Sequence, residues 1–185
     1  DEAFLTDVVL DPAAAACGCL IYELLRQMGV AISVDMANLL YLAVLTDTGS
    51  FRYANTGKEA MVMAGELIDL GVEPAAICNR IYASYPLSQL RLEGLALDRA
   101  RLLCEGKGIL TYVCEDDYRA TGSNADEADS CIDRIRTVEN VEIAAVLKQR
   151  GSVYKLSCRA KEYADVRRIC MTFGGGGHLR ASGDT

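Results

Sequence analysis

The sequence predicts an α/β fold in three parts: a mostly helical first part, a connecting helix, and a small α+β domain. Two observations carry this prediction. Up to about residue 84, apolar residues recur at helical spacing between residues that start and stop helices. After the turn at Gly106-Lys107-Gly108, apolar and polar residues alternate instead, as they do in strands. We therefore expect boundaries at 1–84, 85–104 and 105–185.

Four helices are predicted in the first part. Their expected ranges are 11–28 (from Asp11-Pro12 to the stop at Gly29), 33–45 (capped by Ser33), 56–71 (a capping box at Thr56-Gly57-Lys58-Glu59, ended by Gly71) and 74–82 (started by Pro74). These helices carry wide apolar faces, for example Leu20, Ile21 and Leu24. Because such faces usually cover a sheet, we expect an N-terminal part that is missing here to supply one.

The rest of the chain is predicted to change from helix to sheet. Leu87 to Leu103 is predicted to be one amphipathic connecting helix. Strands are expected at Ile109–Cys114, Val141–Lys148 and Val153–Arg159, with helical segments near 126–136 and 164–173. We expect the three strands to form one sheet, with a glycine-rich loop beside the end of the last strand.

Composition places the chain among soluble, cytoplasmic proteins. Hydrophobic residues make up 51% of the chain and charged residues 24%, and no uncharged apolar run is long enough to span a bilayer. The acidic start, Asp1-Glu2, does not resemble the basic beginning of a signal peptide. The eight cysteines include no Cys-x-x-Cys pair and accompany a single histidine, so they cannot form the usual zinc patterns. We interpret them as small core residues in a reducing compartment.

Charge is distributed unevenly along the chain. The net charge is −7, which argues against a protein that binds duplex nucleic acid without sequence preference. Residues 145–185 nevertheless hold eight Lys or Arg and three acidic residues, a net charge of +5. A local anionic ligand and a solvated basic face both fit this pattern.

The glycine-rich segment Gly174-Gly175-Gly176-Gly177-His178-Leu179-Arg180-Ala181-Ser182-Gly183 is the strongest functional signal. Four consecutive glycines are entropically costly, so a compact domain keeps them where the backbone needs positive φ or close approach. Successive N–H groups can then bind an anion, and His178 and Arg180 can add donors. A flexible linker is the alternative, but linkers interleave Ser and Asn with their glycines.

Two further segments hold candidate site residues. Asp47 ends a very apolar helix and precedes Thr48-Gly49, so its carboxylate could bind a metal or serve in a local turn. In the last predicted strand, alternation puts Lys155, Ser157 and Arg159 on one face. Arg159 could hold a phosphate with two hydrogen bonds, or the strand could present solvated charges at an edge.

Together these segments resemble the DHH phosphoesterase superfamily with its first-type DHH-associated C-terminal domain. That domain has a Gly-Gly-Gly-Gly-His loop followed by two small residues and Gly, as at 174–183 here. The segment 46–53, Thr-Asp-Thr-Gly-Ser-Phe-Arg-Tyr, is similar to the fourth motif of the DHH domain in the oligoribonuclease and 3′-phosphoadenosine-5′-phosphate phosphatase branch. The resemblance covers essentially the whole chain. It implies the C-terminal, mostly helical part of a DHH α/β domain (1–84), a connecting helix (85–104) and a DHH-associated substrate-binding domain (105–185).

The resemblance also implies a function. The expected activity is that of a metal-dependent phosphodiesterase or phosphatase that degrades short oligoribonucleotides, as an exonuclease does, and 3′-phosphoadenosine-5′-phosphate. Asp47 matches the family's last catalytic, metal-ligating aspartate, and two Mn²⁺ or Mg²⁺ ions are expected in the intact parent. The implied substrate contacts are Arg159, Gly175, Gly176, Gly177 and His178. The implied partners are short single-stranded RNA or phosphorylated nucleotides, and no membrane is expected as a partner. Whether the protein forms a homodimer is left open by the resemblance.

Two departures from the family pattern matter. Cys158 and Ala160 stand where the family strand usually has Leu and Ser, which puts a hydroxyl contact in doubt. The early motifs with most metal ligands, including Asp-His-His, are absent, so we expect a fragment that is inactive alone. A cyclic-dinucleotide phosphodiesterase is an alternative, although Asn is commoner there at the position of Ser50. Two further alternatives are an exonuclease of the RecJ type and a non-catalytic module that binds nucleotides or RNA.

Overall fold

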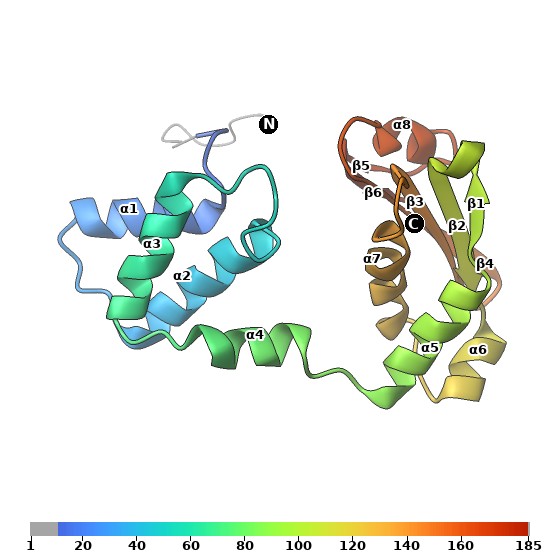
Figure 1. Cartoon of the computed structure of the whole chain (residues 1–185), viewed down its shortest axis with the longest axis horizontal. Helices are drawn as coiled ribbons and strands as arrows, with labels where there is room; N and C mark the ends of the chain where they lie inside the picture. Colours follow the sequence, from blue (N-terminus) through green and yellow to red (C-terminus); the bar gives the residue numbers. More distant parts are fainter. Residues whose placement is uncertain (1–10, 185) are drawn as a thin grey trace. The chain divides into compact units, whose positions relative to one another are not determined.

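The computed structural model describes residues 11–184, which fall into two compact units that divide between Ser84 and Tyr85 (Figure 1). The first unit is helical, and the second contains a sheet with helices on both faces. The chain therefore has a mixed α/β structure. Within the described range, no helix combines the length and the apolar character needed to cross a membrane.

The first unit contains the four predicted helices, with some changed ends. They are α1 (Cys17–Gln27), α2 (Val34–Asp47), α3 (Lys58–Asp69) and α4 (Pro74–Tyr82). Ser33 caps α2 as predicted, because its Oγ accepts a hydrogen bond from the Met36 N–H at 3.3 Å. The predicted start of α1 at Asp11 is wrong, since the Asp11 carboxylate binds the Ala13 N–H within a local turn instead.

The predicted capping box of α3 is also wrong. Gly57 is the N-cap residue and makes no side-chain cap bond. The Thr56 Oγ1 is buried and has no hydrogen-bond partner among the described residues. The helix is stabilised by packing rather than by its cap: Met63 and Leu67 are buried against Leu40 and Leu45 of α2.

The second unit is built on a six-stranded mixed sheet. Its strands are β1 (Arg101–Leu103), β2 (Gly108–Val113), β3 (Ile143–Arg150), β4 (Val153–Ala160), β5 (Gly176–His178) and β6 (Ala181–Gly183). They are ordered β1-β2-β3-β4-β6-β5, and the β2–β3 pair is parallel while the others are antiparallel. The prediction that three strands after Gly108 share one sheet is confirmed. The glycine segment adds an unpredicted hairpin, β5–β6, beside β4.

The predicted connecting helix to Leu103 is wrong in its extent. Helix α5 (Leu87–Asp98) ends earlier, and β1 then pairs with β2. Cys104 and Glu105 take left-handed backbone angles, φ 52° and 54°, which reverse the chain between the two strands. Leu92 of α5 is buried in the core of the second unit, so α5 is part of that unit.

Helices cover both faces of the sheet. On one face, Ala144 and Val146 of β3 are buried with α5 and α7 (Cys131–Arg136), which follows a 3₁₀ turn at Glu127–Ser130. On the other face, Cys158 and Ala160 of β4 are buried under α8 (Val166–Met171). Helix α6 (Glu115–Thr121) follows β2 and was not predicted. Alternate residues of β3 and β4 therefore face different helices, and this alternation decides which side chains can form a site.

Candidate anion-binding site

A pocket of about 600 Å³ lies on the α7 side of the sheet. Its lining consists of charged residues, serines and glycines with two apolar residues: Asp129, Ser130, Ile132, Asp133, Lys148, Lys155, Ser157, Arg159, Gly176, Ala181, Ser182 and Gly183. Three of the lining residues are cationic and belong to β3 and β4. The predicted grouping of Lys155, Ser157 and Arg159 on one face is confirmed.

Strand register aligns the predicted site residues across the sheet. Arg159 pairs with Ala181, and Ala181 pairs with His178. Residues directly opposite each other in antiparallel strands share a face, so Arg159 and His178 lie on the same face, two strands apart. At about 4.8 Å per strand, their backbones are separated by about 10 Å. The hypothesis that Arg159 and His178 share a site required a separation below about 15 Å, and the register meets that requirement.

The glycines of the motif are required by close backbone contacts. Gly177 has φ 137°, and a Cβ there would lie 2.8 Å from the Ala181 carbonyl oxygen. A Cβ at Gly175 would collide with the Gly183 carbonyl oxygen, and Gly174 has φ 89°. The expectation of close approach and positive φ is confirmed. The expected loop of successive N–H groups is wrong in part, because Gly176–His178 is a strand paired with β6.

The two polar side chains of the motif differ in their surroundings. His178 is exposed, and its ring makes no hydrogen bond or ion pair with another described residue. Arg180, which we expected to add a donor for the anion, donates one N–H to the Ala164 carbonyl oxygen at 2.6 Å and so fixes the hairpin to the start of α8. Arg159 donates one N–H to the Cys158 carbonyl oxygen at 3.0 Å. Since a guanidinium has five N–H groups, Arg159 can also bind a ligand.

The segment that leads into α8 is held by a buried carboxylate. Glu142 accepts hydrogen bonds from the N–H groups of Tyr163 and Ala164, both at 2.7 Å, and of Glu162. Burial by itself would raise the pKa of Glu142, but these N–H groups and the nearby Arg180 outweigh it and lower the pKa. The carboxylate therefore stays ionised and anchors the loop next to the β5–β6 hairpin.

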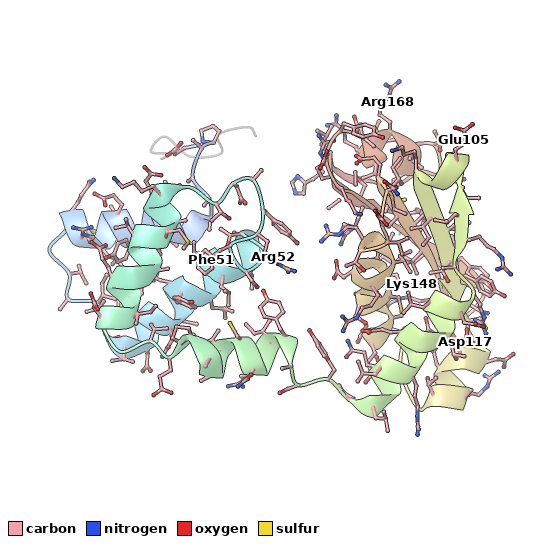
Figure 2. The ribbon with its side chains drawn as sticks, viewed as in Figure 1. Phe51, Arg52, Glu105, Asp117, Lys148 and Arg168 are labelled. Carbon is pink, nitrogen blue, oxygen red and sulfur yellow. The ribbon has the colours of Figure 1, made fainter. Side chains whose placement is uncertain are left out.

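Lys148 and Asp129 were not among the predicted site residues. The Lys148 side chain is only 4% exposed, and its Nζ forms an ion pair with the Asp129 carboxylate. Figure 2 shows Lys148 inside the second unit, whereas Arg168 projects from its surface. The sequence held a signal for Lys148: it continues the alternation of Ala144 and Val146, the buried positions of β3.

The second predicted site, at Asp47, lies in the first unit. Asp47 is the last residue of α2 and its side chain is exposed. The turn that follows is unusual, since Gly49, Ser50 and Phe51 are all left-handed, with φ 55°, 61° and 61°. Non-glycine residues in this conformation are strained, and such strain is concentrated at functional sites. The buried Thr48 hydroxyl stabilises the turn by accepting a hydrogen bond from the Phe51 N–H at 3.1 Å.

The described residues do not supply a complete metal site. Residues 11–184 contain no group of three or more His, Cys, Asp or Glu side chains that could hold an ion. Catalytic metal sites need several such ligands. A metal at Asp47 would need ligands from outside the described part of the chain, so we derive no metal-dependent step from these residues.

Comparison with known proteins adds an evolutionary relation to this geometry. No family model matches the chain. The chain is 32% identical, over 96% of its length, to a bifunctional oligoribonuclease and PAP phosphatase NrnA of Thermus thermophilus. It is 24% identical to the Bacillus subtilis protein of the same name over 94% of its length.

The chain is homologous to NrnA of the DHH family. It spans about half the length of these relatives, 53% and 56% respectively. The fold agrees: a solved structure of an exopolyphosphatase-related protein from Bacteroides fragilis superposes with a TM-score of 0.94 at 25% identity. That superposition covers 100% of this chain and 55% of the other. The predicted resemblance to the DHH family is thereby confirmed.

Proposed function

We propose that the chain is part of a metal-dependent phosphoesterase that hydrolyses short oligoribonucleotides and 3′-phosphoadenosine-5′-phosphate (PAP) in the cytoplasm. The observation that carries the proposal is the cationic pocket on the α7 face of the sheet. Its anchor, Arg159, shares a register position with His178 of the glycine hairpin. The homology to NrnA supports the substrate class, because the relatives are named as oligoribonucleases and PAP phosphatases.

In this proposal the two units have different tasks. Residues 1–84 correspond to the C-terminal part of a DHH domain, in which Asp47 provides one carboxylate toward a Mn²⁺ or Mg²⁺ ion. Residues 105–185 correspond to the DHH-associated domain and bind the substrate. Helix α5, within the predicted linker 85–104, packs with the substrate-binding domain. The exposed Asp47 carboxylate suits metal binding, and the cationic pocket suits phosphate binding.

Within the pocket, Arg159 holds a phosphate of the substrate through its guanidinium. His178 lies on the same face and adds a donor to the same end group. Gly176 lines the pocket and has open space where a Cβ would be, so a ligand can approach the backbone there, whereas Gly175 and Gly177 contribute by letting the hairpin close against β6. Recognition of an end group by a local cationic pocket suits short substrates better than long ones.

The binding part of the proposal is tested with the 185-residue chain and PAP. Charge-assisted hydrogen bonds contribute about 1.5–3 kcal/mol, so Arg159→Ala should raise the Kd for PAP about 10- to 100-fold. Arg168→Ala is the matched control, since it removes the same charge from exposed α8 on the opposite face of the sheet. Calorimetry measures both. Equal Kd values for the wild type and Arg159→Ala would contradict the proposal.

A further inference from the structure

The floor of the pocket contains two lysines directly opposite each other. Lys148 of β3 pairs with Lys155 of β4 across the antiparallel ladder. Side chains at such positions are close neighbours, and like charges there destabilise a sheet. Burial makes the repulsion worse, because the Lys148 side chain is 4% exposed. A sheet keeps such a pair where an anion compensates it.

The compensation within the described residues is incomplete. Asp129 forms an ion pair with Lys148, but its own side chain is 63% exposed. Lys155 forms no ion pair or side-chain hydrogen bond with any residue from 11 to 184. Asp133, the other acid in the lining, lies 3.8 Å from Arg136 instead. The lysine pair therefore has one exposed carboxylate for two ammonium groups, one of them buried.

The lysine pair is well separated along β4 from Arg159, the predicted phosphate anchor. Lys155 and Arg159 are on the same face of β4, separated by four residues, or about 13 Å of strand. Arg159 is further held at its own end by the hydrogen bond to the Cys158 carbonyl oxygen. Ser157 lies between them and pairs with Gly183, which has no side chain to divide the pocket. The pocket is thus continuous and has a cationic group at each end.

We propose that Lys148 and Lys155 form a second phosphate subsite, separate from the subsite at Arg159 and His178. The pocket would then bind a ligand with at least two phosphate groups joined through a sugar, such as a short oligoribonucleotide, along β4. This inference rests on the proposed function and specifies how the same pocket distinguishes an oligonucleotide from a mononucleotide.

In this arrangement the Asp129 carboxylate occupies the position beside Lys148 that the second phosphate would take. Asp129 belongs to the one-turn 3₁₀ segment Glu127–Ser130, and its exposed carboxylate can leave Lys148 when a phosphate arrives. Asp129→Asn should therefore tighten binding of an oligonucleotide several-fold. Asp133→Asn removes the same charge from the same lining but frees no lysine, so its effect should be smaller.

The test compares two ligands, 5′-AMP and the 5′-phosphorylated triadenylate pApApA, on the full 185-residue chain. The wild type should bind pApApA about 10-fold or more tightly than AMP. Lys155→Ala should remove most of that gain and change AMP affinity less than about twofold, as expected for one charged contact. Arg159→Ala should weaken both ligands, and Arg168→Ala should change neither. Lys155 is only partly buried, so the Lys155→Ala variant should fold. Lys148→Met, which keeps most of the aliphatic side chain, is the second variant of the lysine pair.

The outcomes separate the inference from the proposed function. If Lys155→Ala weakens AMP and pApApA equally, or weakens neither, while Arg159→Ala weakens both, the second subsite is overturned and the Arg159 anchor stands. If Arg159→Ala and His178→Ala have no effect but Lys155→Ala lowers pApApA affinity, the anchor fails and the lysine subsite stands. If the wild type binds neither ligand, both are overturned.

Discussion

At the scale of single residues, the four glycines of the motif have different structural demands. Gly177 has φ 137° and no room for a Cβ, whereas Gly176 has neither positive φ nor any atom within 4 Å of the place that a Cβ would take. A purely sequence-based argument treats the four as equivalent. The difference arises because Gly177 faces the backbone of β6, and the sequence did not predict this strand.

Gly177→Ala should therefore destabilise the protein while Gly176→Ala should not. Backbone strain of this kind costs about 1–3 kcal/mol, and contact with the rigid Ala181 carbonyl oxygen adds to it. We expect a loss of about 2 kcal/mol or more in the free energy of unfolding, measured by urea denaturation, together with weaker PAP binding. Gly176→Ala is the matched control for stability and should keep the wild-type free energy of unfolding, because a Cβ there meets no other atom. Equal stability of the two variants would show that the hairpin does not have this geometry.

Other residues of the site could be predicted to different degrees. Arg159 and His178 could be found because alternation along a strand and a specific motif each point to them. Asp129 could not, since it lies in an irregular turn and its role depends on Lys148, which is 19 residues away in sequence. Lys148 itself carried a readable signal, a charged residue at a buried strand position, although the basic character of the segment favours an exposed position for it.

At the scale of elements, the end of α5 shows why local pattern was insufficient. The apolar spacing of a helix continues through Leu102 and Leu103, yet these residues form β1. Tertiary contacts decide the outcome: the Arg99 guanidinium binds the Asp117 carboxylate at 2.5 and 2.6 Å and stacks 4.9 Å from the Tyr112 ring. These partners come from α6 and β2, which are distant from α5 in sequence, so no local window contains them.

Asp117 joins α5 to α6, and this connection predicts a pH dependence. The hydrogen bonds from Arg99 are the main reason that the pKa of Asp117 is lowered to about 2, and burial opposes them. A carboxylate with a lowered pKa stabilises the fold above its ordinary pKa near 3.8, and this contribution is lost as the pH falls toward about 2. The contribution is about 2 kcal/mol.

Asp117→Asn should remove that contribution at neutral pH and flatten the loss of stability between about pH 4 and pH 2. Denaturation midpoints measured across this range provide the test. Asp116→Asn is the control, because the Asp116–Arg119 pair is on the surface and such pairs contribute little. An acid-stability profile of Asp117→Asn that matches the wild type would contradict the assignment.

At the scale of the whole molecule, the two candidate sites belong to different units. Asp47 is in the first, and the pocket with Arg159 and Lys148 is in the second. The general class, helices followed by a sheet domain, could be predicted from caps and from the change of period. The sheet order and the pairing of the glycine hairpin with β4 could not, because strand neighbours depend on contacts across long sequence separations.

We predict that the 185-residue chain binds nucleotides without hydrolysing them. The described residues contain no cluster of three metal ligands, so Mn²⁺ titration calorimetry should show weak binding or none. Short RNA incubated with Mn²⁺ and the chain should remain intact. Tight stoichiometric Mn²⁺ binding would reveal ligands in positions that we have not recognised, and Asp47→Ala would then show whether Asp47 is one of them.

The left-handed turn after Asp47 has a consequence for how this segment tolerates substitution. Ser50 and Phe51 each hold a backbone conformation that costs an L-residue about 1–2 kcal/mol, so glycine would relieve strain at both positions. Phe51 recovers part of the cost through its edge-to-face contact with Tyr41, with ring centroids 6.2 Å apart. Ser50 has no ring with which to make such a contact. Glycine would be less strained than serine at position 50, so Ser50→Gly should raise the stability of the fold, and a loss of activity in the same variant would then be due to the missing side chain rather than to unfolding.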